Sequence, residues 1–181
     1  MSASSEFIPV HIAILTVSDT RTLETDTSGQ LLADSVEHAG HTLVDRKLIK
    51  DDVYQMRAVV SQWIASADVE AVLITGGTGF SGRDTTPEAM LPLFDKQIEG
   101  YGELFRQISC RDIGTSTIQS RAVGGLANNT VIFCMPGSTN ACRTAWVEII
   151  QEQLDSRHSP CNFVKLITAA RLQLDECGTR G

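Results

Sequence analysis

Apolar residues follow two different spacings along the first half of the chain, and the two spacings alternate. Nearly continuous apolar runs, rich in β-branched residues, predict strands buried on both faces at 10–18, 42–49 and 70–77. Between them, apolar residues recur with helical spacing, at positions 31, 32, 35, 36 and 39 and again at 56, 59, 60, 63 and 64. This β-α-β-α-β order predicts an α/β fold, in which a mostly parallel sheet carries helices on both faces.

The second half adds a small β-hairpin to this pattern. A helical region is predicted from about 87 to about 109, with breaks at Gly100 and Gly102. Two strand-like runs, "RAVGGLA" and "TVIFCMP", then flank Asn128-Asn129, a residue pair suited to a two-residue hairpin turn. A tight turn and a last helix follow the second run.

The chain has 181 residues, of which 42% are hydrophobic, and this is enough for a sizeable core in one domain. No linker, repeat or low-complexity stretch divides it. We therefore predict a single domain over residues 8–167, with terminal tails at 1–7 and 168–181, and we leave the fold of the second tail open.

Charge and cysteine usage narrow the function classes. The net charge of −7 and an isoelectric point near 5.0 argue against general binding of nucleic acid or anionic membranes. The first apolar run is far too short for a signal peptide or a membrane span, so we expect a cytoplasmic protein. The five cysteines never form C-x-x-C, which favours reduced, buried thiols over a disulfide framework or a zinc site.

The segment "LITGGTGFSGRDTTPEAM", residues 73–90, carries the main chemical signal. Its glycines spell G-x-G-x-x-G, but they follow the third predicted strand and no helix starts at once, so the context of a dinucleotide fingerprint is missing. The same segment resembles a P-loop, except that Arg83 and Asp84 stand where Lys and Ser/Thr would hold the phosphates and magnesium. Both interpretations fail.

A third interpretation is an anion site at the carboxyl end of a strand, where open α/β sheets bind ligands. Gly76, Gly77 and Gly79 allow the backbone to approach a ligand closely and to expose its N–H groups. A carboxylate at Asp84 would repel phosphate unless a divalent cation lay between them, which points to a magnesium-nucleotide. A glycine-rich connection without a ligand remains the alternative.

Three further features are expected at the same sheet edge. Asp51 or Asp52 can cap the next predicted helix. Asp51, at the end of the second predicted strand, is either a second metal carboxylate or a plain helix cap, and the spacing alone slightly favours the cap. Thr85 to Glu88 matches a capping box, while Thr86 before Pro87 suits a cap one residue later. The turn at residues 135–141, "MPGSTNA", is either a second anion-binding turn or an ordinary capped turn.

Five strings, "ILTVSDT", "DTSG", "LITGGTGFSGRDTTPEA", "QSRAVGG" and "MPGSTNACRTAW", occur in this order over about residues 8–167. Together they resemble the molybdenum cofactor biosynthesis family of molybdopterin-binding proteins, the MoaB/MogA group. The resemblance implies a three-layer α/β/α domain that assembles as a homotrimer or homohexamer. It also implies molybdopterin and ATP as substrates and Mg²⁺ as cofactor, with transfer of AMP to the terminal phosphate of the pterin and release of pyrophosphate.

The resemblance also implies site residues at the matching positions of this chain. The glycine-rich phosphate loop falls on Gly76, Gly77, Thr78 and Gly79. From its place beside this loop, and not from the resemblance, Arg83 is either a residue that screens phosphate charge or an ordinary surface arginine. Asp84 and Asp51 fall on the two carboxylates that are catalytic and would hold the metal. The pterin-binding turn falls on Pro136, Gly137 and Ser138. Two hypotheses follow: a molybdopterin adenylyltransferase, and a non-catalytic protein of the same fold that binds or delivers molybdopterin.

Overall fold

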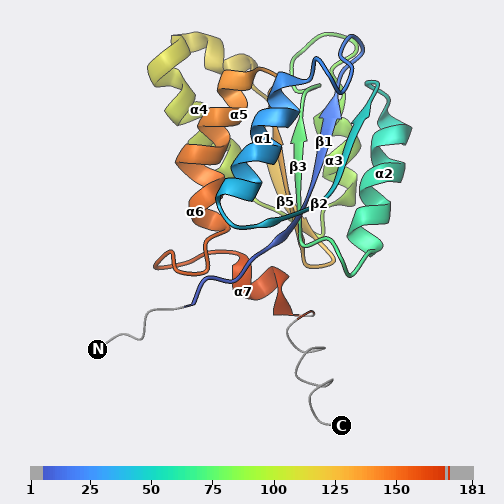
Figure 1. Cartoon of the computed structure of the whole chain (residues 1–181). Coiled ribbons are helices and arrows are strands. Elements are labelled where there is room, and N and C mark those ends of the chain that lie inside the picture. Colours follow the sequence, from blue (N-terminus) through green and yellow to red (C-terminus); the bar gives the residue numbers. More distant parts are fainter. Residues whose placement is uncertain (1–5, 170, 172–181) are drawn as a thin grey trace.

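A computed structural model of the chain describes residues 6–169 and residue 171 (Figure 1). Six strands form one sheet in the order β2-β1-β3-β6-β5-β4. Their bounds are β1 His11–Val17, β2 Thr42–Ile49, β3 Ala71–Thr75, β4 Lys96–Gln97, β5 Val123–Ala127 and β6 Thr130–Met135. The neighbours among β2, β1, β3 and β6 are parallel, and β5 is antiparallel to both β6 and β4. The predicted mostly parallel sheet with a hairpin is confirmed.

Helices cover both faces of this sheet and give a three-layer α/β/α arrangement (Figure 1). Their bounds are α1 Thr27–His38, α2 Val53–Ala65, α3 Thr86–Met90, α4 Glu99–Ile113, α5 Thr139–Ala145, α6 Gln151–Gln153 and α7 Val164–Ile167. Short 3₁₀ segments at Leu91–Leu93 and Gly114–Gln119 follow α3 and α4, and a π-helical turn at Trp146–Ile150 joins α5 to α6. Figure 1 shows α1, α4 and α5 on one side of the sheet and α2 on the other.

The central strands are apolar throughout because each of their faces contributes to a different core. On β1, Ile12 and Ile14 pack under α1 and α5, whereas Ala13, Leu15 and Val17 pack under α2 and α3. The same alternation holds on β3 and β6. A strand with two buried faces cannot carry the polar half of the usual alternating pattern.

The hairpin and the end of the first helix agree with the sequence. Asn128 and Asn129 have φ of 47° and 64°, the left-handed conformation that a two-residue turn between β5 and β6 requires. Gly40 follows α1 with φ of 87°, as expected for the residue after a helix end.

The predicted helical region from 87 to 109 is wrong in its middle. The chain leaves the helix after α3, passes through β4 at the sheet edge and enters α4 only at Glu99. Gly100 and Gly102 therefore lie inside a helix and do not break it. A Cβ at Gly102 would lie 2.3 Å from the carbonyl oxygen of Ala122, so this glycine allows α4 to pack closely against the chain before β5.

The expectation that the cysteines are buried thiols needs correction. Of the cysteines within the described residues, Cys134 and Cys142 are buried, but Cys110 and Cys161 are exposed, and all four are free thiols. Cys177 lies outside the described residues. His41 is buried, and its Nδ1 accepts a hydrogen bond from the N–H of Val10 at 3.2 Å.

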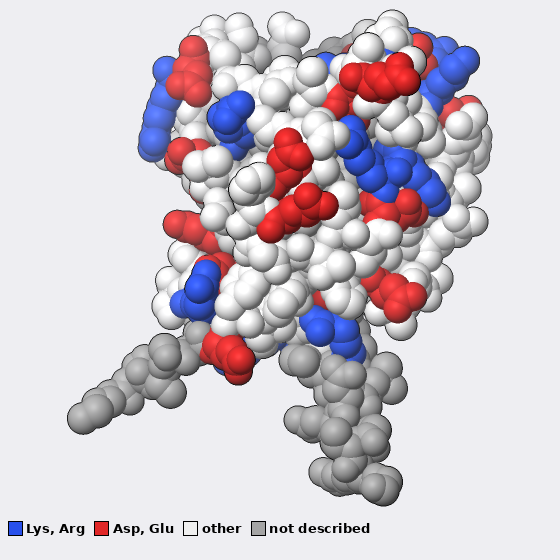
Figure 2. Space-filling model, viewed as in Figure 1, with Lys and Arg blue, Asp and Glu red and all other residues white. Residues whose placement is uncertain are grey.

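The surface of the face viewed in Figure 2 carries acidic and basic side chains interspersed, and neither sign forms a broad patch there. Among the described residues, no helix is long and apolar enough to cross a membrane.

Candidate functional site

A cleft of about 500 Å³ opens at the carboxyl ends of β1, β3 and β6. Its walls include residues 76–79 after β3 and residues 136–138 after β6, so the two turns singled out in the sequence line one cavity. The chain runs from β1 outward to β2 and then returns to β3 on the other side of β1. The cleft thus lies at the point where the direction of winding reverses, which is the usual ligand site of open α/β sheets.

The glycine turn after β3 lies directly against two carboxylates. Gly77 has φ of 63°, and a Cβ on it would lie 2.7 Å from Oδ2 of Asp51. A Cβ on Gly79 would lie 2.8 Å from Oδ2 of Asp84. Side chains at these two positions would therefore displace the carboxylates as well as block the approach of a ligand to the backbone.

Asp84 lines the cleft and is held by its own loop. The N–H of Ser81 donates to Oδ2 of Asp84 at 2.8 Å, and the N–H of Asp84 donates to the carbonyl of Ser81 at 3.0 Å. The side chain is half-buried. One face of the carboxylate therefore fixes the loop, while the residue forms part of the cavity wall.

Asp51 is half-buried next to Gly77 but does not itself line the cleft. Its Oδ1 accepts a hydrogen bond of 2.6 Å from the hydroxyl of Thr85. Burial raises the pKa of Asp51, against the lowering effect of the hydrogen bonds from Thr85, and the charges of Asp84 and Asp19 raise it further. Three carboxylates thus share this corner of the site.

Asp51 is not a helix cap, so the interpretation that spacing slightly favoured is wrong. The cap of α2 is Asp52, whose Oδ1 accepts from the N–H groups of Tyr54 and Gln55 at 2.9 and 2.8 Å. Because Asp52 satisfies the helix end, Asp51 is free to turn toward the glycine loop.

The predicted capping box at the start of α3 is also wrong. Neither Thr85 nor Thr86 makes a side-chain cap on α3. Thr85 donates to Asp51, and the hydroxyl of Thr86 donates to the carbonyl of Gly76 at 2.8 Å. Both threonines therefore fix the glycine turn and Asp51 relative to each other.

Arg83 is not among the described residues that line the cleft. Its guanidinium forms an ion pair of 2.7 Å with Asp19, and two thirds of its side chain is exposed, at 66%. The pair connects the loop after β1 to the loop that carries Asp84, at the rim of the site.

The turn after β6 combines the second cavity wall with a helix start. The hydroxyl of Ser138 accepts from the N–H of Ala141 at 3.1 Å and caps α5. Pro136, Gly137 and Ser138 all line the cleft. The ordinary capped turn is therefore confirmed, the same turn lines the cleft, and anion binding by it stays a prediction.

Arg121, which sequence reasoning did not select, fastens the loop from Gly79 to Glu88. Its Nε donates to the carbonyl of Gly79 and its Nη2 to the carbonyl of Asp84, both at 2.8 Å, and Nη1 pairs with Glu88. The guanidinium also lies over the ring of Phe80, 5.1 Å from its centroid. Arg121 lies in "QSRAVGG", one of the strings that carry the family resemblance. The spacing of residues along the chain gives no sign of the long-range contacts that Arg121 makes, so sequence reasoning did not single it out.

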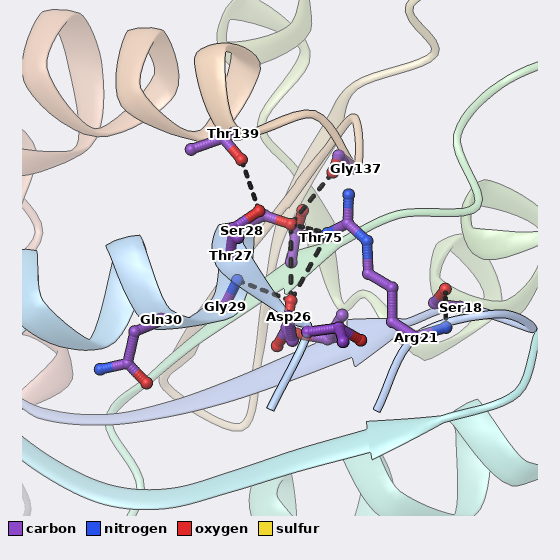
Figure 3. A network of polar contacts seen from close by, with 12 residues as sticks. Ser18, Arg21, Asp26, Thr27, Ser28, Gly29, Gln30, Thr75, Gly137 and Thr139 are labelled. Atoms are coloured by element: carbon purple, nitrogen blue, oxygen red, sulfur yellow. Dashed lines mark hydrogen bonds and ion pairs between the residues drawn. The ribbon is translucent and has the colours of Figure 1, made fainter. Parts of the chain in front are cut away.

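A second missed group surrounds Asp26, in "DTSG" (Figure 3). Asp26 is the N-cap of α1, accepts from the N–H of Gly29 at 2.9 Å and has a fully buried side chain. Arg21 and Arg46 both pair with it, at 3.5 and 3.0 Å. The sequence signal for this group is an Asp three residues before Gly29 at the start of a predicted helix. This signal predicts that Asp26 caps the helix, but it does not predict the ion pairs with the two arginines.

Asp51 and Asp84 offer the kind of oxygen ligand that Mg²⁺ takes from proteins. Mg²⁺ commonly takes one or two carboxylates from the protein and keeps waters and substrate phosphates as its other ligands. In the part of the chain that the structure describes, no group of three or more His, Cys, Asp or Glu side chains is arranged to hold a metal alone. Asp51 and Asp84 therefore do not form a closed protein cage, and a metal at either carboxylate would need water or substrate oxygens as its other ligands.

Fold and cleft define a three-layer α/β/α domain whose ligand site is built from backbone turns at the carboxyl edge of the sheet. Residues 13–156 match the family described as "Probable molybdopterin binding domain". The chain is 62% identical over 160 residues to molybdenum cofactor biosynthesis protein B of Escherichia coli K12, covering 88% of this chain and 94% of that protein. This chain belongs to the molybdopterin-binding domain family of molybdenum cofactor biosynthesis proteins.

Solved structures agree with this assignment. The crystal structure of a molybdenum cofactor biosynthesis protein B superposes with a TM-score of 0.79 at 44% identity, over 84% of this chain and 94% of that one. The tungsten cofactor synthesizing protein MoaB from Pyrococcus furiosus gives a TM-score of 0.72 at 33% identity, over 81% of this chain and 92% of that one.

Proposed function

We propose that this chain is a molybdopterin adenylyltransferase, which transfers AMP from Mg-ATP to the terminal phosphate of molybdopterin and releases pyrophosphate. The observation that carries the proposal is the position of Asp84, beside Gly79 and in one cleft with the turn at residues 136–138. A carboxylate next to a phosphate-binding turn is unfavourable for a bare anion and favourable for a metal-bound nucleotide.

In this proposal the glycine turn binds the nucleotide phosphates through its backbone N–H groups, and the turn at 136–138 binds the pterin. Asp84 and Asp51 would hold Mg²⁺, directly or through water, and a bound metal would supply neutralisation of charge on the phosphates. The protein supplies alignment and charge compensation, which is most of what phosphoryl-type transfer needs. Arg83, at the rim, would reach the phosphates only by leaving its ion pair with Asp19.

The bonds change in one displacement. An oxygen of the pterin's terminal phosphate attacks the α-phosphorus of ATP and forms a new P–O–P linkage. The bond between the α-phosphorus and the bridging oxygen breaks, and that oxygen leaves with the pyrophosphate. The chain's own part is to keep the attacking oxygen and the leaving group in line.

A second candidate function is a protein that binds or delivers molybdopterin without adenylylating it. One observation favours it: each of the two carboxylates already uses one oxygen to fix a local loop, Asp84 with Ser81 and Asp51 with Thr85. Such contacts are what a purely structural carboxylate would make.

The discriminating experiment is incubation of the purified chain with molybdopterin, ATP and Mg²⁺, followed by assay of both products. The adenylyltransferase predicts adenylylated pterin and pyrophosphate in equal amounts, and neither product when Mg²⁺ is removed by a chelator. Tight binding of molybdopterin with no product at high protein concentration would leave the second function.

A further inference from the structure

The loop after β1 places one arginine in the wall of the cleft. Arg21 and Asp84 are the charged side chains among the described residues that line it. Asp84 belongs to the glycine turn, whereas the guanidinium of Arg21 extends toward Ser28 and the turn at Gly137 (Figure 3). The two charges of the cavity are therefore of opposite sign and belong to different walls.

Contacts with Ser28 and Asp26 hold the Arg21 side chain in this direction. Its Nη1 donates to the hydroxyl of Ser28 and lies 3.5 Å from Oδ1 of the buried Asp26. Ser28 in turn donates to the carbonyl of Gly137 at 3.0 Å, so the arginine is connected to the second turn through one hydroxyl. Guanidinium groups aimed by such contacts lose less freedom when they bind a ligand than mobile surface arginines do.

The ion-pair balance leaves positive charge facing the cavity. Burial raises the pKa of Asp26, but hydrogen bonds from Gly29, Thr16 and Arg46, with the charge of Arg46, outweigh burial and hold the pKa below its ordinary value. Asp26 is thus a single negative charge beside two guanidiniums, those of Arg21 and Arg46. Within the described residues, Nε and Nη2 of Arg21 have no hydrogen-bond partner and stay free to bind a ligand.

The two turns meet beside this arginine. A Cβ on Gly137 would lie 3.2 Å from Cα of Gly76, so the walls are in near contact at that point. In the proposed reaction the pterin's terminal phosphate must lie between the pterin turn and the nucleotide turn, because it attacks the nucleotide. The junction of the two turns is therefore where a positive charge would meet it.

We propose that Arg21 binds the terminal phosphomonoester of the pterin substrate and thereby selects the phosphorylated ligand. This inference rests on the proposed function for the identity of the ligand and adds the residue that recognises its phosphate. An arginine presents a planar set of donors that matches two phosphate oxygens, which backbone N–H groups of a turn alone do not provide.

The test is a binding comparison with two ligands and four forms of the full-length protein, without nucleotide or Mg²⁺. The ligands are a pterin that bears a terminal phosphomonoester and the same pterin after enzymatic removal of the phosphate. The proteins are wild type, Arg21→Gln, Arg21→Lys and the control Arg143→Gln, which removes an exposed arginine of α5 that does not line the cleft. Pterin fluorescence reports the dissociation constants.

We expect wild type and Arg143→Gln to bind the phosphorylated pterin about tenfold or more tightly than the phosphate-free pterin. A ratio of this size corresponds to the free energy of one charge-assisted hydrogen bond. Arg21→Gln should lose most of this ratio and keep wild-type affinity for the phosphate-free pterin, and Arg21→Lys should be intermediate. A variant that merely disturbs the cleft would weaken both ligands alike, and this result would overturn the inference. An unchanged ratio in Arg21→Gln would overturn it as well.

Two further measurements distinguish phosphate recognition by Arg21 from nucleotide binding and from the adenylyl transfer itself. If Arg21→Gln loses affinity for Mg-ATP but not for the phosphorylated pterin, the arginine serves the nucleotide and the assignment is wrong. If wild type selects the phosphorylated pterin through Arg21 but forms no adenylylated product, the inference stands and only the proposed reaction fails. If wild type forms the adenylylated product and Arg21→Gln keeps the wild-type preference for the phosphorylated pterin, the inference is refuted and the proposed reaction stands.

Discussion

Two consecutive aspartates at the end of β2 have different partners and should have different roles. Asp52 caps α2 through Tyr54 and Gln55, whereas Asp51 turns to Thr85 and lies against Gly77. Asp52 is thus a matched control for Asp51, the neighbouring carboxylate that we propose to be catalytic.

Asp52→Ala should lower the free energy of unfolding by about 1 kcal/mol, the usual worth of a helix cap, and leave adenylyl transfer unchanged. Asp51→Asn should abolish transfer without lowering stability, because the amide oxygen can still accept from Thr85 and a half-buried charge beside Asp84 and Asp19 is removed. Urea unfolding and turnover measured on both variants check this. The account fails at this residue if Asp51→Asn is active, or if its only defect is unfolding.

At the scale of elements, the segment from Gly79 to Glu88 is positioned by a residue far away in sequence. Arg121, which precedes β5, holds this segment at both ends and stacks on Phe80 between them. The hydrogen bond from Arg121 to Glu88 holds the pKa of that carboxyl below its ordinary value. The loop that carries Asp84 is therefore fastened to the hairpin as well as to α3.

Arg121→Met should loosen this loop and raise KM for ATP by about tenfold, the cost of losing charge-assisted hydrogen bonds, while the core of the domain stays folded. Hydrogen exchange should accelerate at residues 79–88 and remain unchanged in β1 and β3. Arg121→Lys should recover only part of the loss, because an ammonium group cannot reach both carbonyls in one plane. Uniformly faster exchange across the domain would mean that Arg121 acts on global stability instead.

The elements themselves were largely predictable, and the failures have physical causes. Strands with two buried faces and a hairpin with two left-handed asparagines leave clear local patterns, and β2 has the predicted bounds, 42–49. The helical prediction through 87–109 failed because β4 has only two exposed residues and leaves no apolar pattern. Gly102 was misjudged because its role is a close contact with Ala122, which the sequence does not display.

Some residues of the candidate site could likewise be predicted from the sequence, and others could not. The two turns and Asp84 could be found because strand ends, glycines and a carboxylate lie together in the sequence. Arg21 and Arg121 could not, because each acts through contacts with segments elsewhere in the chain, Arg21 at Gly137 through Ser28 and Arg121 at Gly79. Sequence spacing carries no signal for contacts of that kind.

At the scale of the whole molecule, stability should depend on pH through His41. Burial lowers the pKa of His41, partly opposed by the charge of Asp155. The unfolded chain takes up this proton near pH 6.5 and the folded chain resists it, so stability is full above that pH and falls as the pH drops below it. The ring also packs against Trp146, with 6.3 Å between centroids, so protonation would place a charge in the core.

Between pH 7.5 and 5.5, wild type should therefore lose more unfolding free energy than His41→Asn, whose amide oxygen can still accept from Val10 but cannot take up the proton. Urea unfolding at the two pH values gives the comparison. Equal losses in both proteins would show that His41 does not control this window.

Assembly is a second property of the whole molecule. We propose a homotrimer or homohexamer, on the strength of the family resemblance, with molybdopterin and nucleotide as its small-molecule substrates in the cytoplasm. Static light scattering at micromolar concentration should give three or six times the chain mass of 19.6 kDa. A monomer mass would rule this out.

The most direct test of the central claim follows labelled phosphorus from ATP in the presence of molybdopterin and Mg²⁺. With wild type, label at the α-phosphate should appear in the pterin product, and label at the γ-phosphate should appear in pyrophosphate. With Asp84→Ala, both transfers should fall at least about 100-fold, while the circular dichroism spectrum stays that of the folded protein. The account is contradicted if wild type leaves the α-label on the nucleotide, or if Asp84→Ala transfers it at the wild-type rate.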